Sequence, residues 1–367
     1  MRVLVLNPGS STLKASLVVA GGDAGVADMT IAWPPDAHDA DAVVGAALGA
    51  LGTDADAVGY RVVHGGDQYR AAARVDDALI AAVERLDQLA PLHNRRAADV
   101  MRAGLAAVPR VPHIAAFDSA FHATLPEDGW RYPLPADWVA RWAIRRFGFH
   151  GLSVAWSTRR AAELLGRPAA DMRLVVAHLG SGCSVTAVDR GRSVDTSMGF
   201  TPYEGLMMGT RAGSVDPGIL LHMVSQGLAH EELSDGLAHR SGLLAVGGTS
   251  DVRELEPMAA SGDPAARLAL AMFGRRAAAA IAAAATALPA LDGLVFTGGI
   301  GEHAASIRAD IVRRLALLRV PTMLREVPAD AVVAEGPPAV VVVIAREDRM
   351  IADEAAALLG DQPPPAG

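Results

Sequence analysis

The sequence predicts an α/β protein of two domains with a cleft between them, and three observations support this. Short β-branched apolar runs alternate with longer helical stretches along the chain. An apolar strand, a Gly/Ser turn and a returning strand occur at residues 3–19 and again at residues 174–188. A length of 367 residues is enough for two domains, each with its own core.

The first half of the chain is predicted to form a sheet with helices between its strands. Strands are expected at residues 3–6, 13–19, 26–33, 58–63 and 111–117, and helices at 36–51, 76–89 and 94–107. The strand at 58–63 carries Arg61, and Asp118 directly follows the strand at 111–117. Because ligands of α/β sheets bind beyond the carboxyl ends of strands, these two residues are candidates for a site.

The second half, which we expect to begin near His122, repeats this pattern. Strands are predicted at 174–177, 183–188, 294–297 and 340–344. Helices are predicted from near 153, from Asp216-Pro217, at 263–288, after the glycine turn at 298–302 as far as 318, and from 346–348. The connections between them are a Pro- and Trp-rich stretch at 132–142, a Gly- and Met-rich stretch at 198–213 and loops at 241–244 and 250–253. Residues 361–367 contain three prolines and are predicted to be a disordered tail.

Composition excludes several classes of function. There are 33 Lys and Arg residues against 41 Asp and Glu residues, so the net charge of −8 gives no electrostatic reason to bind nucleic acid or an anionic membrane. The single cysteine, Cys183, rules out an intrachain disulfide, suggests a reducing compartment and is expected to pack rather than react. The apolar stretch at 277–291 is shorter than the roughly 20 residues of a membrane span and predicts a buried helix. With no secretory signal visible, we expect a cytoplasmic protein.

The two Gly/Ser turns suggest a phosphate site. Glycine lets the backbone come close to a ligand, and the neighbouring hydroxyls can donate to phosphate oxygens. The sequence has no GxxxxGK[ST] motif, so a P-loop is excluded. On shape alone, two unrelated hairpins with ordinary turn residues explain the pattern equally well.

A resemblance of motifs along most of the chain favours the phosphate site over two unrelated hairpins. VLVLNPGSSTLK, YRVVHGG, PLHN, FDSAFH, FGFHG, HLGSG, DTSMGFTPYEGLMMGTR, SGLL, SDVR and FTGGIGE occur in this order. They resemble the blocks of the acetate kinase family, within the sugar kinase, actin and Hsp70 superfamily, and the DTSMGFTPYEGLMMGTR block is the most specific of them. The resemblance implies two ribonuclease-H-like domains of the actin ATPase type. We expect residues 1–122 to form the first domain and 123–347 the second, with the helix at 348–360 packing back on the first.

The resemblance implies reversible phosphoryl transfer between ATP and acetate, giving ADP and acetyl phosphate, with Mg²⁺ or Mn²⁺, in a homodimer. A kinase for propionate or another short-chain acid, or one that uses another donor, is the alternative within this class. A non-catalytic nucleotide or acyl-phosphate sensor is the alternative outside it. A sensor needs no transfer machinery, so matching transfer residues argue against it. The preferred acid, the direction in the cell and the oligomeric state are not written in the sequence.

Transfer to a carboxylate requires that the charge of two anions be neutralised, and the candidate residues fit that need. Arg61 and Arg211 resemble the family's two arginines, one for the carboxylate and one for the transferring phosphoryl group. His150 resembles its transition-state histidine. Asp118 is a catalytic candidate, with a helix cap as the alternative. Asn7 and Glu347 are the metal candidates, and for Glu347 a helix N-terminal carboxylate is the alternative.

The resemblance also implies a pocket for the alkyl end of the acid and a nucleotide site. The pocket residues are Val63, Leu92, Phe149 and Pro202, together with Arg61. The nucleotide and phosphate residues are Asn7, Ser10, Thr12, Lys14, His178, Gly180, Ser181, Gly182, Asp251, Val252, Arg253, Gly299, Ile300, Gly301 and His303. Three of these depart from the family pattern, which has Ser at Thr12 and Asn at Ser181 and His303. The last two departures put the identity of the phosphoryl donor in doubt more than the chemistry.

Overall fold

The computed structural model of the chain describes residues 1–9, 11–22, 25–34, 36–37, 39–90, 93–323 and 330–360. The chain divides into two units. The first unit comprises Met1–Ala123, Phe149–Trp156 and a C-terminal segment that begins at Arg346. The second unit comprises Thr124–Gly148 and Ser157–Ala345. The predicted tail at 361–367 lies outside the described residues.

Each unit has one six-stranded sheet, and the two sheets share one topology. In the first sheet the order is β3 (Gly25–Ala32), β2 (Thr12–Val19), β1 (Arg2–Pro8), β4 (Ala57–Val62), β6 (His113–Phe117) and β5 (Ala73–Arg74). In the second it is β9 (Arg192–Thr196), β8 (Cys183–Asp189), β7 (Arg173–Leu179), β10 (Gly293–Thr297), β12 (Ala339–Val342) and β11 (Ala331–Ala334). Both begin with an antiparallel meander, continue through parallel strands and end on an antiparallel edge strand. This confirms the predicted α/β fold with two ribonuclease-H-like sheets.

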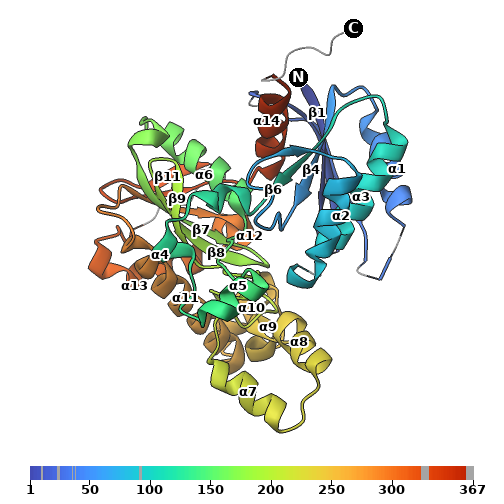
Figure 1. The fold of residues 1–367 in the computed structure, drawn as a ribbon. Coiled ribbons are helices and arrows are strands. Elements are labelled where there is room, and N and C mark those ends of the chain that lie inside the picture. Colours follow the sequence, from blue (N-terminus) through green and yellow to red (C-terminus); the bar gives the residue numbers. More distant parts are fainter. Residues whose placement is uncertain are drawn as a thin grey trace. The chain divides into compact units, whose positions relative to one another are not determined.

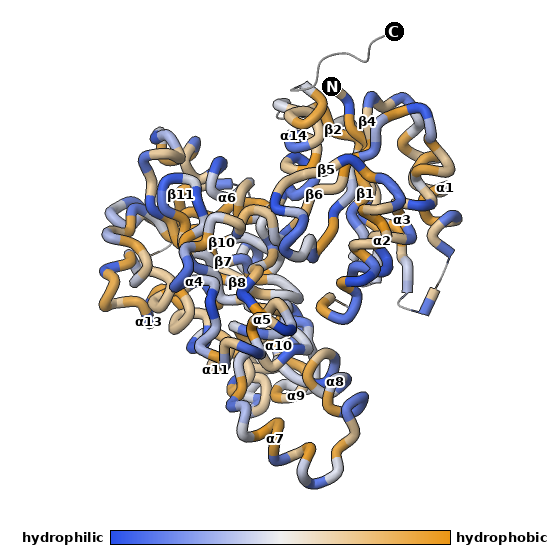
Figure 2. The backbone as a smooth tube through the Cα atoms, in the orientation of Figure 1, coloured by the Kyte–Doolittle hydropathy of each residue, from blue (hydrophilic) through white to orange (hydrophobic). Residues whose placement is uncertain are grey.

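Alternation along β1 builds a core on each face of the first sheet. Leu4 and Leu6 pack with α1 (Ala40–Leu51), α2 (Asp77–Arg85) and α3 (Asn94–Ala107), whereas Val3 and Val5 pack with α14 (Glu347–Gly360). Figure 1 shows the three helices on one face of the sheet and α14 on the other. In Figure 2 the strands of this sheet include long hydrophobic stretches, as expected for strands covered on both sides.

The close approach of α14 to the sheet depends on a glycine in β4. A Cβ atom at Gly59 would lie 2.6 Å from Cγ2 of Ile351, closer than real Cβ contacts come. Ile351 is fully buried, together with Ala352 and Ala355 of the same helix. Glu347, the first residue of α14, is thereby held near the carboxyl ends of β1 and β4.

The longest helix of the second unit, α11 (Pro264–Ala285), is long and apolar enough to cross a membrane by length and composition. It begins with Asp263, whose side chain accepts a hydrogen bond from Ala266 N, and with proline at its first position. It packs on β7 and β8 and on the neighbouring helices α9, α10 and α13. Phe273 and Ile281 are fully buried by this packing, so the contacts of α11 are those of a core helix.

The remaining helices include several that the sequence analysis predicted as connections, loops or a turn. Those predictions were wrong for α5 (Ala136–Trp142), α9 (Gly242–Gly247), the start of α10 (Val252–Ala260) and α12 (Gly298–His303). Asp251 caps α10 by accepting from Arg253 N, and Gly298 enters α12 with a φ of +76°. The others are α4 (Glu127–Trp130), α6 (Gly151–Leu164), α7 (Pro217–Ser225), α8 (His230–His239), α13 (Ala305–Arg314) and 3₁₀ turns at Asp87–Leu89, Ala120–Thr124, Ala169–Asp171 and Ala316–Leu318.

Two mid-helix glycines should respond to alanine with opposite signs. A Cβ at Gly104 of α3 would lie 2.0 Å from the hydroxyl of Tyr60, which is fully buried and donates to Nδ1 of His113 at 2.6 Å. We expect Gly104→Ala to lower the free energy of unfolding by about 1–3 kcal/mol through overpacking. A Cβ at Gly45 of α1 would have nothing within 4 Å, so Gly45→Ala should raise the free energy of unfolding by about 0.5–1 kcal/mol. Urea unfolding measures both, and a stabilised Gly104→Ala would contradict the packing described.

Candidate active site

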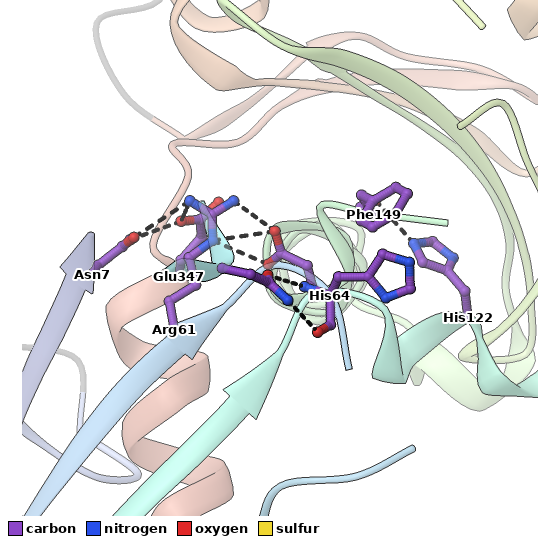
Figure 3. Close-up of polar contacts among 8 residues, drawn as sticks. Asn7, Arg61, His64, His122, Phe149 and Glu347 are labelled. Carbon is purple, nitrogen blue, oxygen red and sulfur yellow. Dashed lines mark hydrogen bonds and ion pairs between the residues drawn. The ribbon is translucent and has the colours of Figure 1, made fainter. Parts of the chain in front are cut away.

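Four polar side chains meet at the carboxyl ends of β1, β4 and β6, around Arg61. The guanidinium of Arg61 contacts Asp118 through Nη2 at 2.6 Å and through Nε at 3.2 Å from each carboxylate oxygen. Its Nη1 lies 3.3 Å from Oδ1 of Asn7 and 3.5 Å from Oε2 of Glu347. The circuit closes where Nδ2 of Asn7 donates to Glu347 at 2.9 Å (Figure 3). We call these four residues the Arg61 cluster.

Burial and charge act in opposite directions on the Arg61 cluster. Burial raises the pKa of Asp118 to about 6, with Arg61 opposing the rise and Glu347 adding to it. Burial disfavours the charge on Arg61, but Asp118 and Glu347 outweigh it, so the pKa of Arg61 is raised. Arg61 therefore stays a cation, held in one orientation by carboxylates on two sides.

The segment that carries His150 is fastened to the backbone around Asp118. Gly151 N donates to the carbonyl of Asp118 at 2.9 Å, and a Cβ at Gly151 would lie only 2.1 Å from that oxygen. The backbone N–H of His150 donates to the Asp118 carboxylate. His150 has a φ of +60°, a conformation that is uncommon for a residue with a side chain and is maintained by these contacts.

His122 and His64 both contact Phe149, the residue that precedes His150. His122 is fully buried and its Nε2 donates to the carbonyl of Phe149 at 3.0 Å. His64 is also fully buried, and its ring meets that of Phe149 edge-on with centroids 5.2 Å apart (Figure 3). Asn94 holds His64 in place by accepting from its N–H at 3.1 Å and donating to its carbonyl at 3.0 Å. These contacts give both histidines a structural role.

Of the four expected pocket residues, Val63 and Phe149 lie in the first unit and both are buried. Pro202 lies in the second unit, where it is buried. Leu92 lies outside the described residues. Val63 and Phe149 thus belong to the same unit as the Arg61 cluster, and Pro202 belongs to the other unit.

The turn between β1 and β2 is closed by a hydrogen bond from Gly9 N to the carbonyl of Thr12 at 2.8 Å. Asn7 and Lys14 are paired across the two strands, and the side chain of Lys14 is exposed. Ser10 lies outside the described residues. The turn therefore presents Asn7, Thr12 and Lys14 at one end of the hairpin.

In the second unit, the turn between β7 and β8 meets two other segments. Gly180 N donates to the carbonyl of Gly182 at 3.0 Å, and Gly209 N donates to that of Ser181 at 3.2 Å. A Cβ at Gly180 would lie 3.7 Å from Nε2 of His178 and 3.9 Å from the backbone N of Gly299. Cys183 is buried beneath, where burial raises its thiol pKa to about 12, as suits a packing residue. Small residues thus bring three backbone segments together, as expected of a phosphate site.

The rest of the predicted nucleotide residues lie at the starts of two helices. Asp251 and Arg253 form an ion pair at 2.6 Å next to Val252, and the side chain of Arg253 is 90% exposed. Ile300 and Gly301 lie in α12, and His303 at its end is largely exposed, with Nε2 3.7 Å from Glu302. Glu302 was not predicted as a site residue. Its Oε1 accepts a hydrogen bond from Ala345 N at 2.9 Å, just before the start of α14. The GIGE motif, which ends at Glu302, is the sequence pattern that could have indicated this residue.

Arg211 is largely buried at the far end of the connection at 198–213. Its Nη1 donates to the carbonyl of Pro202 at 2.7 Å, and burial lowers the pKa of Arg211 from its usual high value. Backbone bonds from Ser241, Leu243 and Leu244 to residues 208–210 hold this end of the connection against α9. Arg211 is thus a second oriented arginine, in the second unit.

Among the described residues, no group of three His, Cys, Asp or Glu side chains is placed to hold a metal ion. Oδ1 of Asn7 and Oε2 of Glu347 nevertheless lie 3.3 and 3.5 Å from the same atom, Nη1 of Arg61, so two oxygen ligands are near each other. Mg²⁺ commonly takes one or two protein oxygens and completes its shell with waters and substrate phosphates. The oxygen donors present therefore fit Mg²⁺ or Mn²⁺ that is bound together with a nucleotide.

Comparisons with known proteins identify the family of the chain. The sequence model of the Acetokinase family matches residues 38–353. An acetate kinase of Deinococcus deserti is 46% identical over 345 residues, 87% of this chain and 86% of that protein. Two crystal structures are similar at 32% identity: the acetate kinase of Porphyromonas gingivalis, with a TM-score of 0.85 over 98% of this chain and 99% of that one, and a propionate kinase of Francisella tularensis, with a TM-score of 0.86 over 96% and 98%.

His122 should make stability depend on pH. Burial lowers its pKa to about 4, below the roughly 6.5 of an unfolded histidine. Between these values the unfolded chain binds a proton that the folded chain does not, so stability falls as pH drops from about 6.5 to 4, by up to about 3 kcal/mol. His122→Gln cannot titrate, and urea unfolding at pH 7 and pH 4.5 should show a smaller pH-dependent loss.

His230→Gln serves as the matched control, because the side chain of His230 is 89% exposed. It should show the same pH dependence as the parent protein. A His122→Gln variant whose stability falls with pH as steeply as that of the parent would contradict the assignment.

Proposed function

Because the chain belongs to the Acetokinase family, we propose that the Arg61 cluster and Arg211 serve reversible phosphoryl transfer between ATP and acetate, giving ADP and acetyl phosphate. The chain is an acetate kinase. The observation that carries the residue assignment is the geometry of Arg61, a buried cation oriented by Asp118, Asn7 and Glu347. A cation held this way at the end of a strand suits recognition of a carboxylate or a phosphoryl group.

Transfer between two anions needs charge neutralisation and alignment more than covalent help. We assign Arg61 and Arg211 to the carboxylate of the acid and the transferring phosphoryl group. His150 donates a hydrogen bond to the equatorial oxygens as charge accumulates on them. Asp118 maintains the orientation of Arg61 and of the His150 backbone. Mg²⁺ or Mn²⁺, bound by Asn7 and Glu347, would neutralise the phosphates of the nucleotide.

The donor is assigned to the second unit, at the turn of residues 180–182 and the starts of α10 and α12. Backbone N–H groups there suit phosphate oxygens. Ser181 and His303 differ from the asparagines usual in the family, so selectivity for ATP over other donors is expected to be weaker. The side chain of His303 is 79% exposed beside Glu302, which leaves its ring accessible to a base or ribose.

The acid is assigned to Val63, Phe149 and Pro202, with Leu92. A small pocket suits a methyl group better than an ethyl group, and one methylene is worth about 1–3 kcal/mol in such a pocket. Acetate is therefore the preferred substrate of this proposal. Propionate is the second candidate, since a propionate kinase is as similar in structure as an acetate kinase is.

We infer a homodimer that forms through α7 and acts in the cytoplasm, where the thiol of Cys183 stays reduced. No residue of α7 is buried, and Ile219, Leu221 and Val224 are each more than half exposed. Figure 2 shows this helix as a hydrophobic stretch. Such a surface on a protein is typical of an interface.

Light scattering in solution tests the dimer. We expect twice the mass of one chain, and a shift toward the 37.9 kDa of one chain in Leu221→Glu, whose new carboxylate would be buried without a partner. The exposed Leu317, which lies on a different part of the second unit, provides the matched Leu317→Glu control. A parent protein that is monomeric at micromolar concentration would contradict the proposal.

Acyl phosphate trapped as hydroxamate tests the function. With ATP and Mg²⁺ we expect turnover in the order acetate, propionate, butyrate. His150→Ala and Arg211→Ala should each lower kcat by about a hundredfold or more while changing the KM for acetate far less, because their contacts strengthen in the transition state. His230→Ala, at an exposed site, should leave turnover unchanged. A parent that makes no acyl phosphate from any of the acids, or a His150→Ala variant with normal turnover, would overturn these assignments.

A further inference from the structure

The orientation of Arg211 depends on a segment without regular structure. We call residues 197–213 the transfer loop; the structure describes all of them and assigns no helix or strand there. The guanidinium of Arg211 donates from Nη1 to the carbonyl of Pro202, nine residues earlier. The position of Pro202 therefore determines where the guanidinium points.

Arg146 holds the start of the transfer loop. Its Nη1 donates to the carbonyls of Thr196 at 2.9 Å and Met198 at 3.0 Å, and its Nη2 donates to Oε1 of Glu204 at 3.0 Å. These acceptors lie on both sides of Pro202 in the sequence. One guanidinium thus folds the chain between Met198 and Glu204 into a closed turn.

Tyr132 completes this network from the other side. Its hydroxyl donates to Oε2 of Glu204 and accepts from the backbone N of Phe200 at 3.1 Å. The guanidinium of Arg146 lies 5.4 Å from the centre of the Tyr132 ring. Both residues come from the connection between the first sheet and α6, so residues distant in sequence determine the shape of the transfer loop.

The packing around this network leaves no free space. A Cβ at Gly199 would lie 1.7 Å from Oε2 of Glu204 and 2.0 Å from the hydroxyl of Tyr132. The carbonyl of Gly199 accepts from Phe147 N at 3.0 Å, in the stretch that leads along the chain to His150. Glycine is required here because the backbone itself lies against the tyrosine–glutamate hydrogen bond.

We infer that Glu204, with Tyr132 and Arg146, forms a positioning network that sets the orientation of Arg211 through Pro202. None of the three is assigned to the substrates. The inference rests on the transfer role proposed for Arg211. It predicts that disturbing the network lowers turnover by misplacing Arg211 and, because Pro202 is also assigned to the acid, changes acid binding to a smaller extent.

A double-mutant cycle on kcat tests the network. Tyr132→Phe removes only the hydroxyl, and we expect kcat to fall roughly tenfold or more while the KM for acetate changes by less than about threefold. In an Arg211→Ala background the same change should cost less than about twofold, because there is no guanidinium left to misplace. If that background is too slow to measure, Arg211→Lys, which loses the planar fork, replaces it.

Tyr60→Phe is the matched control, since it also removes a buried tyrosine hydroxyl that is hydrogen-bonded, in the first unit. It should lower the melting temperature and leave kcat within about twofold of the parent value. Glu204→Gln should resemble Tyr132→Phe, because an amide oxygen and an NH₂ group cannot accept both hydrogen bonds.

Several outcomes would overturn the inference. Normal kcat in Tyr132→Phe, with a strong loss in Arg211→Ala, overturns the network alone. If Tyr132→Phe lowers kcat by the same factor in the parent and in the Arg211 variant, the effect is a general structural one and the inference is wrong. The inference is also wrong if Tyr60→Phe lowers kcat as much as Tyr132→Phe does. Normal turnover in Arg211→Ala overturns the proposed role of Arg211 and the network together.

Discussion

The ion pair between Arg61 and Asp118 is the interaction on which the first unit's active residues depend. A carboxylate with no exposed surface is costly to bury unless hydrogen bonds and an opposite charge compensate it. Arg61 provides the charge, and the backbone N–H of His150 provides a further hydrogen bond. The same guanidinium also contacts Asn7 and Glu347. The pair therefore holds together Asn7 of β1, the end of β6 and the first residue of α14 around Arg61 of β4.

The two sheets have the same topology, yet their parallel strands end in different chemistry. In the first sheet, β4 and the end of β6 supply the charged side chains of Arg61 and Asp118. In the second, the ends of β7 and β10 lead into Gly180–Gly182 and into α12, which present backbone. One framework thus offers oriented charge in one unit and accessible N–H groups in the other.

Much of the fold was predictable because the strands are short, β-branched and bounded by turn residues. The helices α5, α9 and α12 were missed because proline and glycine in these stretches are typical of connections. The structure shows what stabilises one of them: a Cβ at Gly242 of α9 would lie 2.2 Å from the carbonyl of Met208, so α9 packs on backbone that no local pattern reveals.

The site was predictable only in part, for a similar reason. Asp118 could be proposed from its place after a strand, but its contact with Arg61 joins residues 57 positions apart and depends on the register of β4 and β6. Glu347 begins α14, as the helix alternative expected, and it also contacts Arg61 and Asn7, whereas its role as a metal ligand stays a prediction. Glu204 lies in the DTSMGFTPYEGLMMGTR motif, but no pattern in the sequence indicated that it contacts Tyr132 and Arg146.

The place of α14 has a consequence for the making of the protein. The first unit is assembled from segments on both sides of the second unit in the sequence, so its sheet lacks the cover of Ile351, and Arg61 lacks Glu347, until α14 has been made. Until then, the apolar face that includes Val3 and Val5 stays open to chaperones or to water. The Arg61 cluster is therefore incomplete until α14 has been made, and a chain truncated before Glu347 would lack one of its four members.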